Sequence, residues 1–315
     1  MATTGIVTSP LCLEHFAGPG HPERPERLVA VLRALREAPT LRACTWLDAP
    51  RATLEQIGAV HAQELAPSVR AASLRGRALL DEGDTYVSSE SYEAALRAAG
   101  APIAACELIL SGAWSNAFVA VRPPGHHAEE STAQGFCLFN NVAIAARWLR
   151  QQGLARVAVV DFDVHHGNGT QHIFERDASV FYASLHQYPH YPGTGAQTER
   201  GTGDGLGTTL NCPLASGTGD REWLTALEVS VLHELEQFRP EFLLISAGFD
   251  AHRDDPLSGT LVSTQGYSEM SAALADFART TCHGRIVSVL EGGYDLNALA
   301  SSARAHVEAL ARAAP

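Results

Sequence analysis

Side chains that can do chemistry are concentrated in one short stretch of this sequence, residues 161–170. The stretch follows the apolar residues 157–160, which are typical of a fully buried strand. Asp161, Asp163 and His165 then alternate, and the strand period of two predicts that they project to one side. Two carboxylates and an imidazole at the end of a buried strand are costly unless they are paired or hold a cation. A salt-bridged strand end is one interpretation, and a metal site is the other.

Three further apolar strands are followed by polar, glycine-rich sequence. These strand ends are Arg-Pro-Pro-Gly-His-His at 122–127, Gly-Phe-Asp at 248–250 and Glu-Gly-Gly-Tyr at 291–294. In open α/β sheets, ligands bind outside the carboxyl ends of the strands. Four such ends together therefore predict one shared site.

Residue chemistry indicates which of these side chains would hold a metal. A catalytic zinc keeps three protein ligands and one open position for water or substrate. Asp163, His165 and Asp250 supply such a set. The neighbouring imidazoles of His126 and His127 suit general acid–base work on water beside an open metal.

Two kinds of supporting residue are expected around the histidine pair. Each histidine needs a partner for its other ring nitrogen, and Asp161 and Asn168 are the candidates. Tyr294 follows a flexible Gly-Gly turn and is placed to donate its hydroxyl to an oxyanion opposite the metal. The alternatives, an exposed histidine turn and a surface tyrosine, fit the coincidence of four strand ends less well.

Composition limits the classes of function. The net charge is −12, which argues against a nucleic-acid partner. The six cysteines form no Cys-x-x-Cys pair, as expected for thiols in a reducing compartment. The sequence shows neither a signal-peptide pattern nor about 20 continuous apolar residues, so no membrane partner is expected. We expect a cytoplasmic protein.

The remaining sequence predicts alternating strands and helices. Strands are expected at 5–8, 117–121, 157–160, 179–185, 242–247 and 286–290. Helices are expected from Pro25, from the capping box at 53–56, and at 91–110 (broken near 100–102), 141–152, 220–238, 264–282 and 296–312. This order predicts a single α/β domain over residues 1–315, with a central, mostly parallel sheet and helices on both faces.

Seven motifs, in order from about residue 5 to about residue 300, resemble the zinc-dependent histone deacetylase family. They are His-Pro-Glu-Arg-Pro-Glu-Arg-Leu at 21–28, Arg-Pro-Pro-Gly-His-His-Ala at 122–128, Gly-Phe-Cys at 135–137, Asp-Phe-Asp-Val-His-His-Gly-Asn-Gly at 161–169, Ser-Leu-His at 184–186, Gly-Phe-Asp at 248–250 and Glu-Gly-Gly-Tyr at 291–294. Asn168 stands where class I members carry Asp. The sequence is therefore most similar to class II enzymes and to bacterial deacetylase-like amidohydrolases.

The resemblance implies an arginase-like deacetylase fold and hydrolysis of an N-acyl amide, with an acyl-lysine as the expected substrate. It makes His127 the base and Tyr294 the oxyanion donor, and gives His126 with Asp161 an electrostatic or proton-delivering role. It also implies one catalytic zinc and one or two structural potassium ions. The potassium ligands would be the backbone of Asp161, Asp163, His165 and Leu185 and the side chain of Ser184.

The resemblance also indicates which residues would contact the substrate. Gly135 and Phe136 would line one wall of a tunnel for a thin acyl-lysine arm, and Tyr191 would form the opposite wall. Leu257 stands where relatives that deacetylate polyamines can carry a Glu, which favours an acyl-lysine peptide or protein over a small acylated amine. Asp254 stands where the family commonly has Gly, which is a departure from the family pattern at the pocket rim.

Three other functions are weighed against this one. An acetylpolyamine amidohydrolase would use the same machinery with a different pocket mouth. A binuclear manganese ureohydrolase is a more distant alternative, because residues 250–254 (Asp-Ala-His-Arg-Asp) have a spacing that can bridge two metals. An inactive acyl-lysine binder is disfavoured because the tyrosine and both histidines are present. The sequence does not predict the oligomeric state.

Overall fold

A central sheet of eight parallel strands organises the chain, as seen in a computed structural model that describes residues 3–81 and 83–314. The order across the sheet is β2-β1-β5-β10-β9-β6-β7-β8, and β3 pairs with β4 in a separate small ribbon. The strands are β1 (Thr3–Thr8), β2 (Thr45–Asp48), β3 (Ala78–Leu79), β4 (Tyr86–Val87), β5 (Trp114–Val119), β6 (Val157–Asp161), β7 (Val180–Gln187), β8 (Thr209–Leu214), β9 (Phe242–Ala247) and β10 (Ile286–Leu290).

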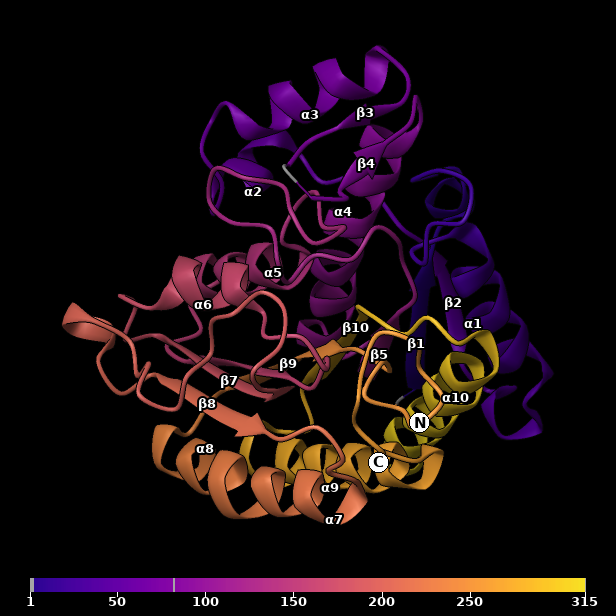
Figure 1. Cartoon of the computed structure of the whole chain (residues 1–315). Helices are drawn as coiled ribbons and strands as arrows, with labels where there is room; N and C mark the ends of the chain where they lie inside the picture. The colour runs from indigo at the N-terminus through magenta and orange to yellow at the C-terminus, as the bar shows by residue number, and fades with distance from the viewer. Residues whose placement is uncertain (1–2, 82, 315) are drawn as a thin grey trace.

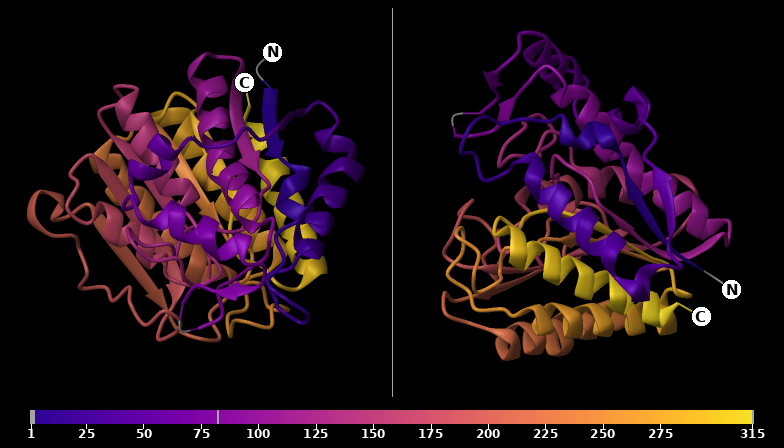
Figure 2. Two further views of the ribbon diagram at one scale, coloured as in Figure 1. Left: turned by 90° about the horizontal axis from the view of Figure 1, so that it is seen from above. Right: turned by 90° about the vertical axis from the view of Figure 1, so that its right-hand side faces the viewer.

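Helices cover both faces of this sheet (Figure 1). They are α1 (Pro25–Glu37), α2 (Leu54–Gly58), α3 (Leu65–Leu74), α4 (Ser91–Leu110), α5 (Asn141–Gln151), α6 (Asn168–Phe174), α7 (Asp220–Thr225), α8 (Leu232–Phe238), α9 (Thr264–Thr281) and α10 (Leu296–Ala313). Helices α4, α5 and α6 lie on one face, and α7, α8 and α9 lie on the other with α10, which has α1 beside it (Figures 1 and 2). Because the strands are buried on both faces, they are apolar along their length. The expected α/β class is confirmed, and every pairing in the large sheet is parallel.

Short helical segments complete the chain: η1 (Pro10–Leu13), η2 (Pro39–Leu41), η3 (Gly203–Gly205) and η4 (Ala226–Val231). The last is a π-helical segment that joins α7 to α8, so the predicted helix at 220–238 is continuous. It ends at Arg239, which adopts the left-handed conformation with φ 54°.

The predicted break in the helix at 91–110 is wrong, since α4 runs through Pro102 without interruption. Proline in a helix interior removes one backbone hydrogen bond and costs about 3 kcal/mol. The helix is closely packed around this proline. Residues 98–106 are all buried, and a Cβ on Gly100 would come within 2.2 Å of the carbonyl oxygen of Pro50.

The four strands that were expected to share a site are consecutive in the sheet, as β5-β10-β9-β6. Asp161, the last residue of β6, pairs in register with Ser246 of β9 and Ser184 of β7. The polar segments that follow these strands therefore leave the sheet at one edge, where their side chains can meet.

Candidate active site

Asp163, His165 and Asp250 converge at this edge, from the segments that follow β6 and β9. One ligand atom from each lies within 4.8 Å of the others, and all three residues are buried. His165 Nδ1 is 3.0 Å from Asp163 Oδ1 and 3.2 Å from Asp250 Oδ2. Two carboxylates and one imidazole in this arrangement are a ligand set that zinc and similar divalent cations accept.

The surroundings of these carboxylates fit a cation. Asp250 Oδ2 is buried and, despite its closeness to His165, accepts no hydrogen bond with favourable geometry. A Cβ on Gly248 would lie 2.1 Å from Asp163 Oδ2, and one on Gly292 would lie 2.0 Å from Asp250 Oδ2. Burial and the neighbouring Asp163 carboxylate raise the pKa of Asp250. The backbone thus packs closely around negative charge that the protein alone does not neutralise.

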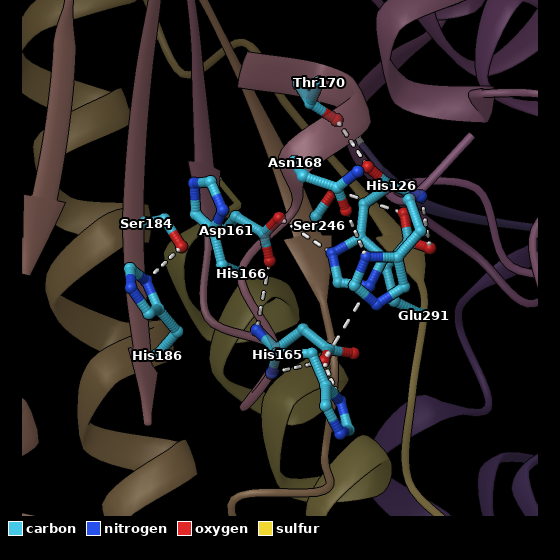
Figure 3. A network of polar contacts seen from close by, with 12 residues as sticks. His126, Asp161, His165, His166, Asn168, Thr170, Ser184, His186, Ser246 and Glu291 are labelled. Carbon is cyan, nitrogen blue, oxygen red and sulfur yellow. Dashed lines mark hydrogen bonds and ion pairs between the residues drawn. The ribbon is translucent and has the colours of Figure 1, made fainter. Parts of the chain in front are cut away.

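The path of the chain differs from the predicted alternation on one strand. Strand β6 ends at Asp161, and residues 162–167 are irregular. Asp161 does not join the ligand group but turns toward His126 (Figure 3). Asp163 and His165 reach the site from the loop, so their convergence depends on loop geometry and not on strand period.

The two adjacent histidines have different partners. His126 Nδ1 lies 3.0 Å from Asp161 Oδ2, which also accepts a hydrogen bond from the hydroxyl of Tyr182 at 3.1 Å. His127 Nδ1 lies 2.8 Å from Asn168 Oδ1. Both orienting contacts that the sequence suggested are therefore present, one to a charged group and one to a neutral amide.

These partners give the histidines opposite charge preferences. Burial opposes a charge on His126, but the carboxylates of Asp161 and Asp163 outweigh it and raise its pKa to about 10. Burial, reinforced by the nearby His126, lowers the pKa of His127 well below its ordinary value. These pKa shifts favour a protonated His126 and a neutral His127 that can accept a proton.

Tyr294 is held firmly in place, contrary to the expected flexible turn. Its backbone N–H donates to Asp255 Oδ2 at 2.6 Å, and the guanidinium of Arg27 lies 4.8 Å from the centre of its ring. Arg27 also donates to the backbone carbonyls of Glu291 and Gly293. Burial raises the pKa of Tyr294 well above its usual range, so the phenol keeps its proton and can act as a donor.

A cavity of about 290 Å³ opens beside the ligand group. It is lined by Pro22, Asp84, His127, Gly135, Phe136, His165, His190, Tyr191, Leu257 and Tyr294. All four residues expected to contact substrate are in this lining. Phe136 adopts a left-handed backbone, φ 67°, which is strained for a bulky residue and is common at functional sites. Its ring meets that of Tyr294 edge to face, with the centres 6.0 Å apart.

Sequence reasoning missed three residues of the cavity wall, Pro22, Asp84 and His190. The ring of His190 stacks on His165 with the centres 5.0 Å apart, and its Nε2 lies 2.9 Å from the carbonyl oxygen of Leu257. The position of His190 next to Tyr191 was the available signal. Asp84 gave none, because it lies in a polar turn far from every motif.

The residues expected to hold potassium lie on the adjoining strands β6 and β7 (Asp161, Ser184 and Leu185) and in the loop that follows β6 (Asp163 and His165). Ser184 and Leu185 are fully buried in β7, and Ser184 is in register with Asp161. Ser184 Oγ lies 2.9 Å from His186 Nδ1 (Figure 3).

The second half of the Asp-x-His-x-Asp segment does not reach the ligand group. His252 Nδ1 accepts from the backbone N–H of Asp254, and His252 Nε2 lies 3.4 Å from Thr264 Oγ1. The Asp254 side chain is two-thirds exposed and outside the cavity lining. In the described part of the chain, these residues therefore offer no second metal position beside Asp250.

The chain belongs to the histone deacetylase domain family, whose model matches residues 21–310. A "Probable deacetylase" of Archaeoglobus fulgidus is 41% identical over 295 residues, covering 93% of this chain and 82% of the relative. "Histone deacetylase 15" of Arabidopsis thaliana is also 41% identical over 295 residues, covering 92% of this chain and 52% of the relative.

A solved structure has the same fold. The crystal structure of the HDA15 HD domain superposes with a TM-score of 0.94 at 39% identity, covering 99% of this chain and 88% of that one. Among the helices that the structure describes, none has the length and apolar character needed to cross a bilayer.

Proposed function

We propose that this protein is a zinc-dependent hydrolase of N-acyl amides and that its substrate is an N-ε-acyl-lysine side chain. The observation that supports this most directly is the position of the Asp163–His165–Asp250 group beside a cavity lined by His127 and Tyr294. This arrangement combines a cation site, a proton acceptor and a hydroxyl donor around one small space.

Asp163, His165 and Asp250 would hold the zinc, His165 through Nδ1, the atom that faces both carboxylates. A bound zinc supplies Lewis-acid polarisation of the amide carbonyl and lowers the pKa of a water molecule. The alternative with two manganese ions finds no support in the positions of His252 and Asp254.

Side chains of the protein would carry out the remaining steps. His127 Nε2 takes a proton from water while the oxygen attacks the amide carbon. The Tyr294 hydroxyl donates to the oxyanion that forms. The C–N bond then breaks, and the amine leaves with a proton from a histidine. His126, kept positive by Asp161, stabilises negative charge from behind or delivers that proton.

The cavity walls support the choice of substrate. Phe136, Tyr191 and Leu257 present apolar surface suited to the methylene arm of a lysine, and Gly135 lets the backbone come close. A Cβ on Gly135 would lie 2.5 Å from His127. Structural potassium on the backbone of Asp161, Asp163, His165 and Leu185 and on Ser184 remains part of the proposal. So does a single catalytic domain spanning residues 1–315.

The test is a rate comparison on the protein as purified, with metal content measured on the same sample. Acetyl-lysine peptides, longer acyl-lysine peptides and acetylated polyamines are compared, each with and without a hydroxamate. We expect one zinc per chain and hydroxamate-sensitive turnover of the peptides. Turnover of polyamines alone would show that the substrate is a small acylated amine and not an acyl-lysine. Two manganese ions per chain would reject the zinc mechanism.

A further inference from the structure

Glu129 lies behind the active site and outside the cavity lining. It follows the histidine pair by two residues, and its carboxylate is only one-fifth exposed. Glu129 Oε1 accepts a hydrogen bond from Asn168 Nδ2 at 2.5 Å, while Asn168 Oδ1 faces His127 Nδ1 at 2.8 Å. The three side chains thus form a row of hydrogen bonds that runs from the carboxylate of Glu129 to His127, the proposed base.

The direction of each hydrogen bond among Glu129, Asn168 and His127 can be assigned in only one way. A carboxylate can only accept hydrogen bonds, so the amide of Asn168 must turn its NH₂ group toward Glu129. Its oxygen then faces His127 and can only accept. The Nδ1 of His127 must therefore carry the hydrogen, which leaves the lone pair on Nε2, the nitrogen that the proposed reaction uses.

Helix α6 builds this arrangement. Asn168 and His172 lie one turn apart and share a face of the helix. His172 Nδ1 lies 2.8 Å from Glu129 Oε1, the same oxygen that Asn168 contacts. The start of the helix is close to the backbone of the histidine loop, because a Cβ on Gly169 would lie 2.2 Å from the carbonyl oxygen of Ala128. The contact with His172 and the close packing of the helix start thus keep the Glu129 carboxylate next to Asn168.

We propose that Glu129 is a positioning residue that fixes the orientation of the Asn168 amide and, through it, the tautomer of His127. The inference rests on the proposed role of His127 as base. It follows from a difference between the two histidines. Asp161, which orients His126, has two equivalent oxygens and cannot be turned the wrong way. An amide has two unlike ends, so Asn168 needs a second group to select one of them.

The closing experiment uses the zinc-loaded, full-length protein and two kinds of measurement. Nitrogen NMR of ¹⁵N-histidine-labelled protein reports which ring nitrogen of His127 is protonated, and His127→Asn identifies the signal. Wild type should show the hydrogen on Nδ1, and Glu129→Gln should show both tautomers. The NMR measurement of the tautomer does not require turnover. Failure of this inference can therefore be distinguished from failure of the proposed function. A wild-type His127 with its hydrogen on Nε2 would overturn the inference.

Kinetics give the second measurement. Glu129→Gln should lower kcat by about 10-fold with little change in KM, in the range seen for groups that orient active-site ligands. Glu130→Gln, the same change at the exposed neighbouring residue, should leave both unchanged. In an Asn168→Asp background no amide has to be oriented, and the new carboxylate would face that of Glu129. Glu129→Gln should therefore lower kcat no further there and can only relieve the repulsion. An equal 10-fold loss in both backgrounds would reject the positioning role.

Discussion

Two buried charged clusters lie side by side in this molecule and differ in how their charges are paired. In the first, which we call the arginine cluster, Glu23 is surrounded by Arg27, Arg122 and His15. Arg122 contacts both oxygens of Glu23, Arg27 Nη1 lies 3.0 Å from Oε1, and His15 Nε2 lies 3.3 Å from Oε2. Backbone carbonyls of Cys12, His15, Glu291 and Gly293 accept four further guanidinium hydrogens.

The second, the carboxylate cluster of Asp163, His165 and Asp250, has no arginine. One imidazole faces two carboxylates, and one oxygen of Asp250 accepts no hydrogen bond. The comparison separates buried charges that have a structural role from buried charges that have a functional role. The guanidinium groups of the arginine cluster find hydrogen-bond partners within the protein itself and hold the turn that carries Tyr294. The carboxylate cluster, in contrast, would need the proposed cation to balance its second carboxylate.

Breaking the arginine cluster should have the largest effect. Glu23→Gln leaves two buried guanidinium groups without their anion, and removal of one partner of a buried ion pair costs about 3–5 kcal/mol. We expect the free energy of unfolding to fall by this amount in urea titrations. Glu26→Gln, an exposed change in the first turn of α1, is the control. A loss below about 1 kcal/mol would show that the cluster does not need its carboxylate.

The next prediction separates the supporting turn from the group that it carries. Tyr294→Phe keeps the backbone bond to Asp255 and the ring beside Arg27 but removes the hydroxyl. Loss of one oxyanion donor lowers kcat by about 10²–10³-fold. Zinc content and the free energy of unfolding should stay at wild-type values. Near-normal turnover would remove Tyr294 from the mechanism.

Metal removal should affect only the carboxylate cluster. A ligand at 100 times its Kd stabilises the folded state by about 2.7 kcal/mol, so chelation should lower the free energy of unfolding by a comparable amount. Glu23→Gln should show the same metal-dependent difference. Asp250→Ala should bind no stoichiometric zinc and should not respond to the chelator. Zinc retained in Asp250→Ala would exclude this residue from the ligand set.

The clusters also differ in how far the sequence predicted them. The carboxylate cluster was predicted because its residues follow apolar strands, and the carboxyl ends of neighbouring parallel strands meet at one edge. The arginine cluster was not predicted. Glu23 and Arg27 belong to a loop and a helix start, and Arg122 comes from a strand end almost a hundred residues away. Nothing in local spacing indicates that such residues meet.

The elements of the fold show the same division. Long apolar strands and amphipathic helices were predicted within a few residues, because period and burial act locally. Strand β2 is short and only half-buried, and β8 contains Pro213, which an edge strand tolerates, so both were missed. Helix α4 runs through Pro102, and Gly100 lies against the backbone of Pro50, a tertiary contact that the local sequence does not indicate.

The smallest predicted effect is the change in the free energy of unfolding at low pH. Burial opposes ionisation of Glu23, but Arg122 and His15 outweigh it and hold its pKa well below the usual 4.5. Because the folded pKa is lowered, the ion pair contributes its full stability above pH 4.5, and this contribution is lost as the pH falls further and the unfolded chain takes up the proton first. The stability difference between wild type and Glu23→Gln should thus be constant from pH 8 to 6. It should shrink by about 1 kcal/mol from pH 4.5 to 3.5, measured by urea unfolding at each pH. A difference that is already shrinking near pH 6 would mean that the arginines do not keep Glu23 ionised.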